Sequence, residues 1–144
     1  MILLQIYGTP APQGSKRHVG NGRMIEVSKK VGPWRAAIVE QAIRDGVSET
    51  RLDGPLVLRV SFYLQRPKGH SGVRGLLPSA PRWPFRVPDL DKLVRSTGDG
   101  LTQAGVIADD ARIVVIHAQK VYADDRATGA EICISQMIEG NEYE

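Results

Sequence analysis

Five aspartates fall within a short part of this sequence, between positions 89 and 110, and their spacing suits metal-assisted chemistry. Asp89 and Asp91 stand at the start of an apolar stripe with helical spacing, and Asp110 precedes an apolar run typical of a strand. Carboxylates that gather repel one another, and Mg²⁺ removes this repulsion because it prefers oxygen ligands. The sequence therefore predicts a Mg²⁺ site formed by Asp89, Asp91 and Asp110, in which Mn²⁺ could substitute. The bound ion would assist the hydrolysis of phosphodiesters.

The same acids have a simpler interpretation. Acidic side chains in the first turn of a helix accept hydrogen bonds from its free N–H groups and favour its dipole. The pair Asp109-Asp110 before a strand is likewise ordinary turn chemistry. On spacing alone this capping interpretation is the more frequent one, so the metal site needs further support.

A helix over residues 90–103 must position the first of these acids. Pro88 cannot continue a preceding strand, so the chain changes direction there. Asp91, Arg95 and Asp99 then recur at i, i+4 and i+8, which places three charged groups along one stripe of the helix. Asp89 at the mouth of the helix is close enough for its carboxylate to point the same way.

The remaining periodicities predict a single α+β domain with a mixed sheet of about four strands and two helices packed on it. Apolar residues alternate clearly over 55–65. Lys120 interrupts the apolar face of the run 112–123, and a turn after that run predicts an antiparallel hairpin. The predicted strands are 2–7, 55–65, 112–123 and 130–138, the predicted helices are 33–45 and 90–103, and a polar tail covers 139–144.

Composition excludes several classes of protein. The 144 residues are 42% hydrophobic and 24% charged, as in soluble globular domains. No apolar run is long enough for a membrane span, and the first residues lack a basic segment and cleavage site, so a cytoplasmic protein with no membrane contact is expected. Cys133 is the only cysteine, which excludes an intramolecular disulfide and a cysteine-based zinc site.

Basic residues gather in two turn-rich stretches although the net charge is only +3. The long connection 66–87 holds five cations and no acid, and the stretch 8–24 begins a second cluster. Such flanks around an acidic centre suit a protein that holds a polyanion. The predicted DNA contacts are Lys16, Arg17, Arg66, Lys68, Arg74, Arg82 and Arg86.

Two aromatic residues lie among the arginines of the 66–87 connection. Trp83 and Phe85 could offer rings to splayed bases, or they could tuck the loop onto the core, and the sequence leaves both open. His70 in the same loop is expected at the solvated surface. Trp34 continues the apolar stripe of the first helix, so the core is its expected place.

The order of these motifs resembles that of the RusA-type Holliday junction resolvases, most closely the phage-encoded branch. The resemblance runs from about residue 5 to about residue 135. Its central part is Pro88-Asp89-Leu90-Asp91-Lys92-Leu93, then Asp99-Gly100-Leu101-Thr102, then Asp109-Asp110 before a valine-rich strand. The stretches Gly8–Arg17 and Pro78–Pro81 are also similar to that branch.

This resemblance implies a homodimeric, Mg²⁺-dependent endonuclease that cuts branched DNA. Asp89, Asp91 and Asp110 match the essential metal-binding acids of the family. Arg95 falls where some members carry an important lysine, and Lys92 replaces a frequent asparagine. Either cation would then neutralise the phosphate or the leaving 3′ oxygen, with Asp99 in a supporting role beside Arg95.

The sequence therefore predicts structure-selective cleavage of branched DNA, with four-way junctions preferred, in recombination and repair. A non-catalytic DNA-binding module whose acids only cap a helix is the alternative. A Mg²⁺-dependent hydrolase of small phosphoesters is a third class, which the extended basic stretches disfavour. Paired cuts need two active sites, so a two-fold dimer is expected. Gly98 and Gly100 make helix 90–103, or its flanking strand, the candidate seam unless the helix frays after Thr97.

Overall fold

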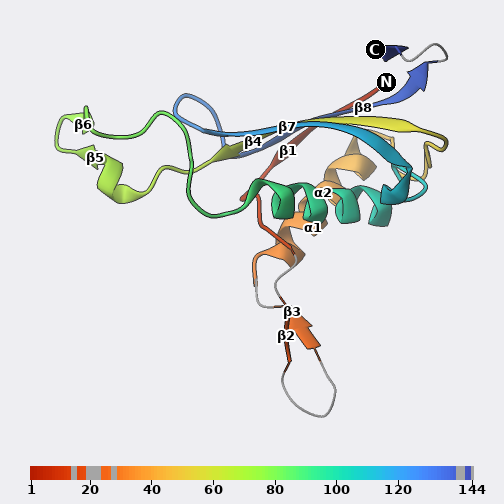
Figure 1. Cartoon of the computed structure of the whole chain (residues 1–144), viewed down its shortest axis with the longest axis horizontal. Coiled ribbons are helices and arrows are strands. Elements are labelled where there is room, and N and C mark those ends of the chain that lie inside the picture. Colours follow the sequence, from red (N-terminus) through yellow and green to blue (C-terminus); the bar gives the residue numbers. More distant parts are fainter. Residues whose placement is uncertain (14–15, 19–23, 27–28, 139–141, 144) are drawn as a thin grey trace.

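A mixed sheet with the strand order β1-β8-β4-β7 forms the centre of the fold, and two helices cover one of its faces (Figure 1). The computed structural model describes residues 1–13, 16–18, 24–26, 29–138 and 142–143, with side chains omitted for 16–18, 24–26, 138 and 142–143. The sheet contains β1 (Ile2–Tyr7), β4 (Leu56–Leu64), β7 (Ile113–Tyr122), β8 (Gly129–Ile138) and β9 (Glu142–Tyr143), and the helices are α1 (Val31–Arg44) and α2 (Leu90–Gln103). This arrangement confirms the predicted α+β class and the predicted helices and strands.

Strand β4 is the central element because it pairs with a neighbour on each side. It runs antiparallel to β8 and parallel to β7. Leu56, Leu58 and Phe62 are fully buried on its helix-facing side, where they form the core with residues from both helices. Trp34 of α1 is also buried there, as predicted, and its Nε1 donates to Oγ1 of Thr97 at 3.2 Å.

The predicted hairpin between the last two long strands is wrong. Strand β4 lies between β7 and β8, so the turn after β7 carries the chain across the end of β4 instead of back along β7. The strands themselves were predicted from local periodicity. Their neighbours depend on the tertiary fold, because the apolar β4 gains most when both of its edges are paired within the sheet.

Strand β7 forms the outer edge of the sheet and contains an irregularity. Leu56 pairs with Ile113, whereas Val57 pairs with Val115, so Val114 is an extra residue at a bulge. The bulge brings Ile113 onto the same side of the strand as Ile116, facing α2. Val114 and Ile116 remain 59% and 50% exposed, which is unusual for large apolar residues on a strand.

Short elements occur where the sequence predicted only turns or a tail. Strands β2 (Lys16–His18) and β3 (Met24–Glu26) pair within the first basic stretch. The long connection contains the 3₁₀ turn η1 (Lys68–His70) and the paired β5 (Ser71–Gly72) and β6 (Gly75–Leu76). The tail adds β9 against β8, and its residues 139–141 and 144 lie outside the described part of the chain. A second 3₁₀ turn, η2 (Asp110–Arg112), precedes β7.

Helix α2 packs against α1 through Gly100, which corrects the predicted role of this glycine. A Cβ at position 100 would lie 2.8 Å from Cδ1 of Ile38, a buried residue of α1. The close approach is therefore made within the chain and not to a partner, and α2 continues past Gly98 and Gly100 to Gln103 without fraying. Each helix has 14 residues, and no helix in the described part is long and apolar enough to span a membrane.

Candidate active site

Helix α2 is fixed to the domain along one face. Leu93 and Leu101 are buried in the core, and Ser96 is buried beside them. The hydroxyl of Ser96 donates to the carbonyl oxygen of Ala11 at 2.6 Å. The backbone N–H of Gln13 donates to the carbonyl oxygen of Lys92 at 3.1 Å. These contacts orient the opposite face of the helix toward β7. They also place Ala11 and Gln13, at the beginning of the first basic stretch, beside the first turns of α2.

A hollow of about 660 Å³ opens between α2 and β7. Two of the predicted site acids, Asp91 and Asp110, line it together with Arg95. The rest of its wall is mostly apolar: Leu90, Val94, Gly98, Ile113, Ile116 and Ala118. The structure therefore brings two acids and one predicted catalytic cation to a common space, in which Asp91, Arg95 and Asp110 all remain exposed to solvent.

Asp110 reaches this hollow because α2 carries a glycine at the point of contact. A Cβ at Gly98 would lie 3.4 Å from Cβ of Asp110, so a larger side chain there would crowd the acid. The turn η2 is held from the other side by Arg112, whose Nε donates to Oδ1 of Asp53 at 2.6 Å. The sequence predicts a partner seam at Gly98, which stays a prediction; the contact of Gly98 with Asp110 depends on the tertiary fold and is not visible in the helical spacing.

The neighbouring aspartates have opposite electrostatic environments. The backbone N–H of Ala111 donates to Oδ1 of Asp109 at 2.8 Å and, with a hydrogen bond from Asp110, holds the pKa of Asp109 below its usual range. The same shared hydrogen bond with Asp109 raises the pKa of Asp110, and partial burial and the charge of Asp99 raise it further. Asp110 is thus a carboxyl group with unrelieved repulsion, whereas Asp109 is a capping residue.

Asp89 occupies the N-cap position of α2, but its side chain forms no capping hydrogen bond. Its Oδ2 lies 3.6 Å from Nζ of Lys92, and it is not among the residues that line the hollow. Within the described ranges, no three His, Cys, Asp or Glu side chains gather in a way that could hold an ion. The structure therefore unites Asp91 and Asp110, with Asp99 near enough to act on Asp110, and leaves Asp89 beside them. Arg95 and Asp99 form no ion pair with any described residue.

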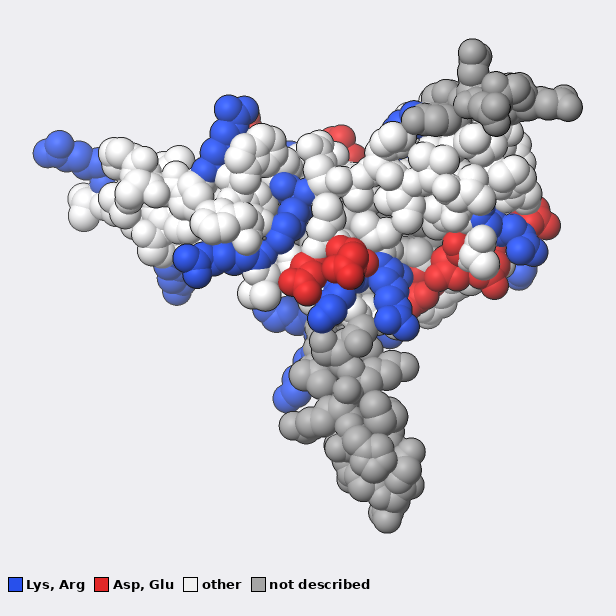
Figure 2. Space-filling view, in the orientation of Figure 1, with Lys and Arg blue, Asp and Glu red and all other residues white. Residues whose placement is uncertain are grey.

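Acidic and basic side chains alternate along the face where α2 lies, and basic side chains also project from the loop that leads into it (Figure 2). Lys68, Arg74, Arg82 and Arg86 of this loop are exposed. Arg66 differs, because its side chain is only 12% exposed and pairs with Asp124 at 2.5 Å. Lys16 and Arg17 belong to β2, but their side chains lie outside the described part.

The aromatic residues of the loop point outward. Trp83 is 51% exposed and Phe85 is 71% exposed, so neither ring tucks the loop onto the core. The guanidinium groups of Arg82 and Arg86 lie over these rings, 5.4 and 5.6 Å from their centroids. His70 is not simply solvated, contrary to expectation: its Nδ1 lies 3.2 Å from Nη1 of Arg66, and its ring meets Tyr122 edge-on.

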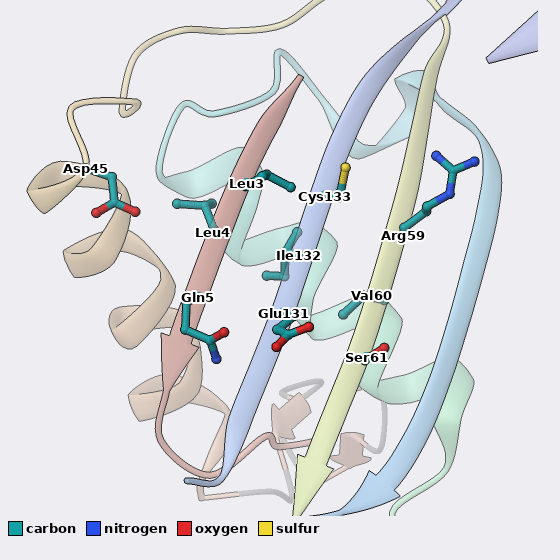
Figure 3. Close-up of a pocket in the computed structure, with 10 residues that line it drawn as sticks. All are labelled: Leu3, Leu4, Gln5, Asp45, Arg59, Val60, Ser61, Glu131, Ile132 and Cys133. Carbon is teal, nitrogen blue, oxygen red and sulfur yellow. The ribbon is translucent and has the colours of Figure 1, made fainter. Parts of the chain in front are cut away.

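A second cavity, of about 490 Å³, lies on the face of the sheet turned away from the helices (Figure 3). Leu3, Cys133 and Arg59 cross it in one row, and Glu131 lies in the next (Figure 3). Glu131 is already paired with Arg126 at 2.5 Å. None of the predicted site acids lines this cavity, so the hollow beside α2 is the better candidate.

Neutralising Asp110 should stabilise the fold in metal-free buffer. Its raised pKa means that the folded state binds a proton more readily than the unfolded chain does, so stability is lost as pH rises through that pKa. Asp110→Asn should therefore have a higher midpoint of thermal unfolding than the wild type at pH 7. The difference should vanish toward about pH 3.9, the ordinary aspartate pKa. Asp125→Asn, at an exposed turn, serves as the control, and a lower midpoint for Asp110→Asn would contradict the repulsion.

Comparison with known proteins agrees with this geometry. The model of the family described as endodeoxyribonuclease RusA matches residues 7–135, which include both helices, all the site acids and both basic stretches. No match was found among individually curated proteins. Because the family match spans most of the chain, this protein belongs to the RusA endodeoxyribonucleases, enzymes that resolve Holliday junctions.

Proposed function

We propose that this endonuclease holds Mg²⁺ with Asp89, Asp91 and Asp110, and that Mn²⁺ can replace it. The observation that carries the proposal is the approach of Asp110 to α2 at Gly98, which puts it in one hollow with Asp91 although the nearby charges of Asp99 and Asp109 disfavour its ionised form. The donors are carboxylate oxygens, the ligands that these hard cations prefer. The residues thus fit the ion. Asp89 lies at an exposed position beside Lys92 and outside the hollow, so its side chain would have to turn toward Asp91 and Asp110 to join them.

A bound ion of this kind activates water and stabilises charge on a phosphodiester. The chain itself supplies the surroundings for this chemistry. Arg95 lines the hollow and can neutralise the phosphate, and Lys92 beside Asp89 is the alternative group for the leaving 3′ oxygen. Leu90, Val94 and Ile113 form an apolar wall beside these charged groups.

The capping interpretation accounts for only one of the acids. Asp109 does accept a backbone hydrogen bond at the start of η2, as a capping residue should. Asp89 stands at the N-cap of α2 without forming such a bond. The pKa of Asp110 is raised, so the one backbone hydrogen bond that it accepts does not offset the effects of Asp109, Asp99 and partial burial. A module whose acids merely cap elements would have little reason to keep these two carboxylates.

The loop 66–87 and the first basic stretch are proposed to hold branched DNA, with four-way junctions as the preferred substrate. Arg82 and Arg86 are exposed next to exposed aromatic rings, an arrangement that suits phosphate contact together with base stacking. Lys68 and Arg74 extend the same surface, and Lys16 and Arg17 follow Gln13, which is bonded to α2. Arg66 remains a proposed contact, although it is already paired with Asp124.

A homodimer across the edge of β7 is also proposed. Within the described sheet β7 pairs only with β4, so its outer edge offers unpaired backbone groups. Val114 and Ile116 expose apolar surface on this strand, next to the apolar wall of the hollow. An isologous contact here would cover that surface and set two active sites on either side of one two-fold axis, as paired cuts require.

Replacing each proposed metal ligand should stop cleavage but preserve binding. Asp89→Asn, Asp91→Asn and Asp110→Asn should each cut a synthetic four-way junction more than about 100-fold more slowly in Mg²⁺, since even the supporting partners of metal ligands contribute about 10- to 100-fold. Junction affinity in EDTA should stay equal or increase, because a charge facing phosphate is removed. Asp125→Asn is the control. An acid whose variant cuts at nearly the wild-type rate is not a ligand.

Arg82→Ala combined with Arg86→Ala should weaken binding to all DNA sequences alike. For each phosphate that the protein no longer binds, the slope of log K against log salt should fall in magnitude by about 0.9 on duplex DNA. Arg44→Ala combined with Arg51→Ala removes the same charge from exposed ion pairs elsewhere and should leave the slope unchanged. Fluorescence anisotropy across a salt series measures both, and an unchanged slope for the loop variant would mean that these arginines do not touch the DNA backbone.

Val114→Gln should weaken the dimer because it places a polar amide in the proposed seam at a residue that does not line the hollow. Sedimentation equilibrium should show dissociation at concentrations where the wild type is dimeric, and a supercoiled cruciform plasmid should yield nicked circles in place of linear product. Leu3→Gln is the matched control, since Leu3 is 66% exposed on β1 at the opposite edge of the sheet. A wild type that is monomeric at micromolar concentration would refute the seam.

A further inference from the structure

The lysine that interrupts the apolar face of β7 has a specific structural partner. Lys120 lies on the side of the strand that also carries Ile116 and Ala118, a side that is otherwise apolar next to α2. Its Nζ donates to the carbonyl oxygen of Arg86 at 2.6 Å and to that of Pro88 at 2.7 Å. An ammonium group has only donors, and charged donors make the shortest and strongest hydrogen bonds to carbonyl groups.

These two bonds hold the chain at the point where it enters the active site. The carbonyl of Pro88 belongs to the planar peptide unit that ends at the nitrogen of Asp89, so fixing its oxygen fixes that plane. The peptide unit on the other side of Asp89 is fixed by α2, because the N–H of Leu93 donates to the carbonyl oxygen of Asp89 at 3.1 Å. With both planes fixed, the direction of the Cα–Cβ bond of Asp89 is fixed as well.

Packing holds the loop at Pro84, which is buried, but restrains the residues between Pro84 and Asp89 much less. Phe85 and Val87 are 71% and 85% exposed, so packing contributes little just before Asp89. The far end of the loop is anchored separately, by Arg66, which donates to the carbonyl oxygen of Pro81 at 2.7 Å and pairs with Asp124. Asp89 itself forms no capping bond that would orient its side chain.

We infer that Lys120 is a positioning residue for Asp89: by holding the Pro88 carbonyl, it directs the Asp89 carboxylate toward the metal site. This inference rests on the proposed role of Asp89 as a metal ligand. The hydrogen bonds of Lys120 go to the backbone carbonyl groups of Arg86 and Pro88, and none goes to a proposed metal ligand or to Arg95. Its effect on metal affinity therefore passes through the backbone at residues 86–88.

Metal affinity in the absence of DNA tests the inference directly. The binding of Mn²⁺ to the full-length protein is measured by the loss of the free-ion signal in electron paramagnetic resonance. Lys120→Met, which keeps the length of the side chain and suits the apolar face, should raise the dissociation constant about tenfold. Lys120→Gln, whose shorter side chain donates without a charge, should have a smaller effect, and Lys120→Arg should be close to the wild type. Gln119→Met, on the opposite side of the same strand, should leave Mn²⁺ binding unchanged.

A double-mutant cycle shows whether the effect passes through Asp89. In the Asp89→Asn background, Lys120→Met should cause no further loss of Mn²⁺ affinity, because the carboxylate that it positions is already absent. An equal loss in both backgrounds would overturn the inference, as would wild-type affinity for Lys120→Met in a folded protein. In either case, Mn²⁺ binding that still depends on Asp89 would leave the proposed function standing. A wild type that binds no Mn²⁺, or binds it independently of Asp89, would overturn the proposed function together with the inference.

Discussion

The candidate active site depends on one close contact, between η2 and α2 at Gly98. Gly98 leaves room for Asp110 to lie beside α2 and to line one hollow with Asp91, where the charges of Asp99 and Asp109 disfavour the ionised form of Asp110. The repulsion is sustained because both elements are fixed elsewhere: α2 by Leu93 and Leu101 in the core, and η2 by the pairing of Arg112 with Asp53. A rigid domain thereby holds carboxylates in an arrangement that an isolated helix and turn would relax.

Local periodicity was sufficient to predict the elements of this fold but not their neighbours. The alternation over 55–65 and the apolar stripe of α2 are short-range signals, and both elements appear where expected. The position of β4 between β7 and β8 depends on contacts between residues that are distant in sequence. It is favoured because the central strand buries its apolar side chains there. The bulge at Val114 is similarly invisible in the alternation, since one extra residue changes which side chains face α2 without changing composition.

The candidate site shows the same division. The acids were recognisable because their types and order match a family pattern, which the match over residues 7–135 confirms at the level of the family. The residues that arrange them were not recognisable, because their partners are distant in sequence. Arg66 and Asp124 are separated by 58 positions, and Lys120 and Arg86 by 34. A lysine within an apolar face was the one visible signal, and only the fold reveals the carbonyl groups that it serves.

The basic residues of this protein form two groups: some are paired within the protein, and others are exposed on the loop before Asp89. Arg66, Lys120 and Arg112 hold loops and turns in place through carboxylates or carbonyl groups, so their charges are already engaged within the protein. Arg82 and Arg86 project from the loop that the first group restrains, at the end nearest Asp89. A net charge of +3 describes neither group. In the proposed function, Arg82 and Arg86 bind phosphates at defined distances from the cleavage site. The internally paired cations would then contribute by fixing the loop from which these two arginines project.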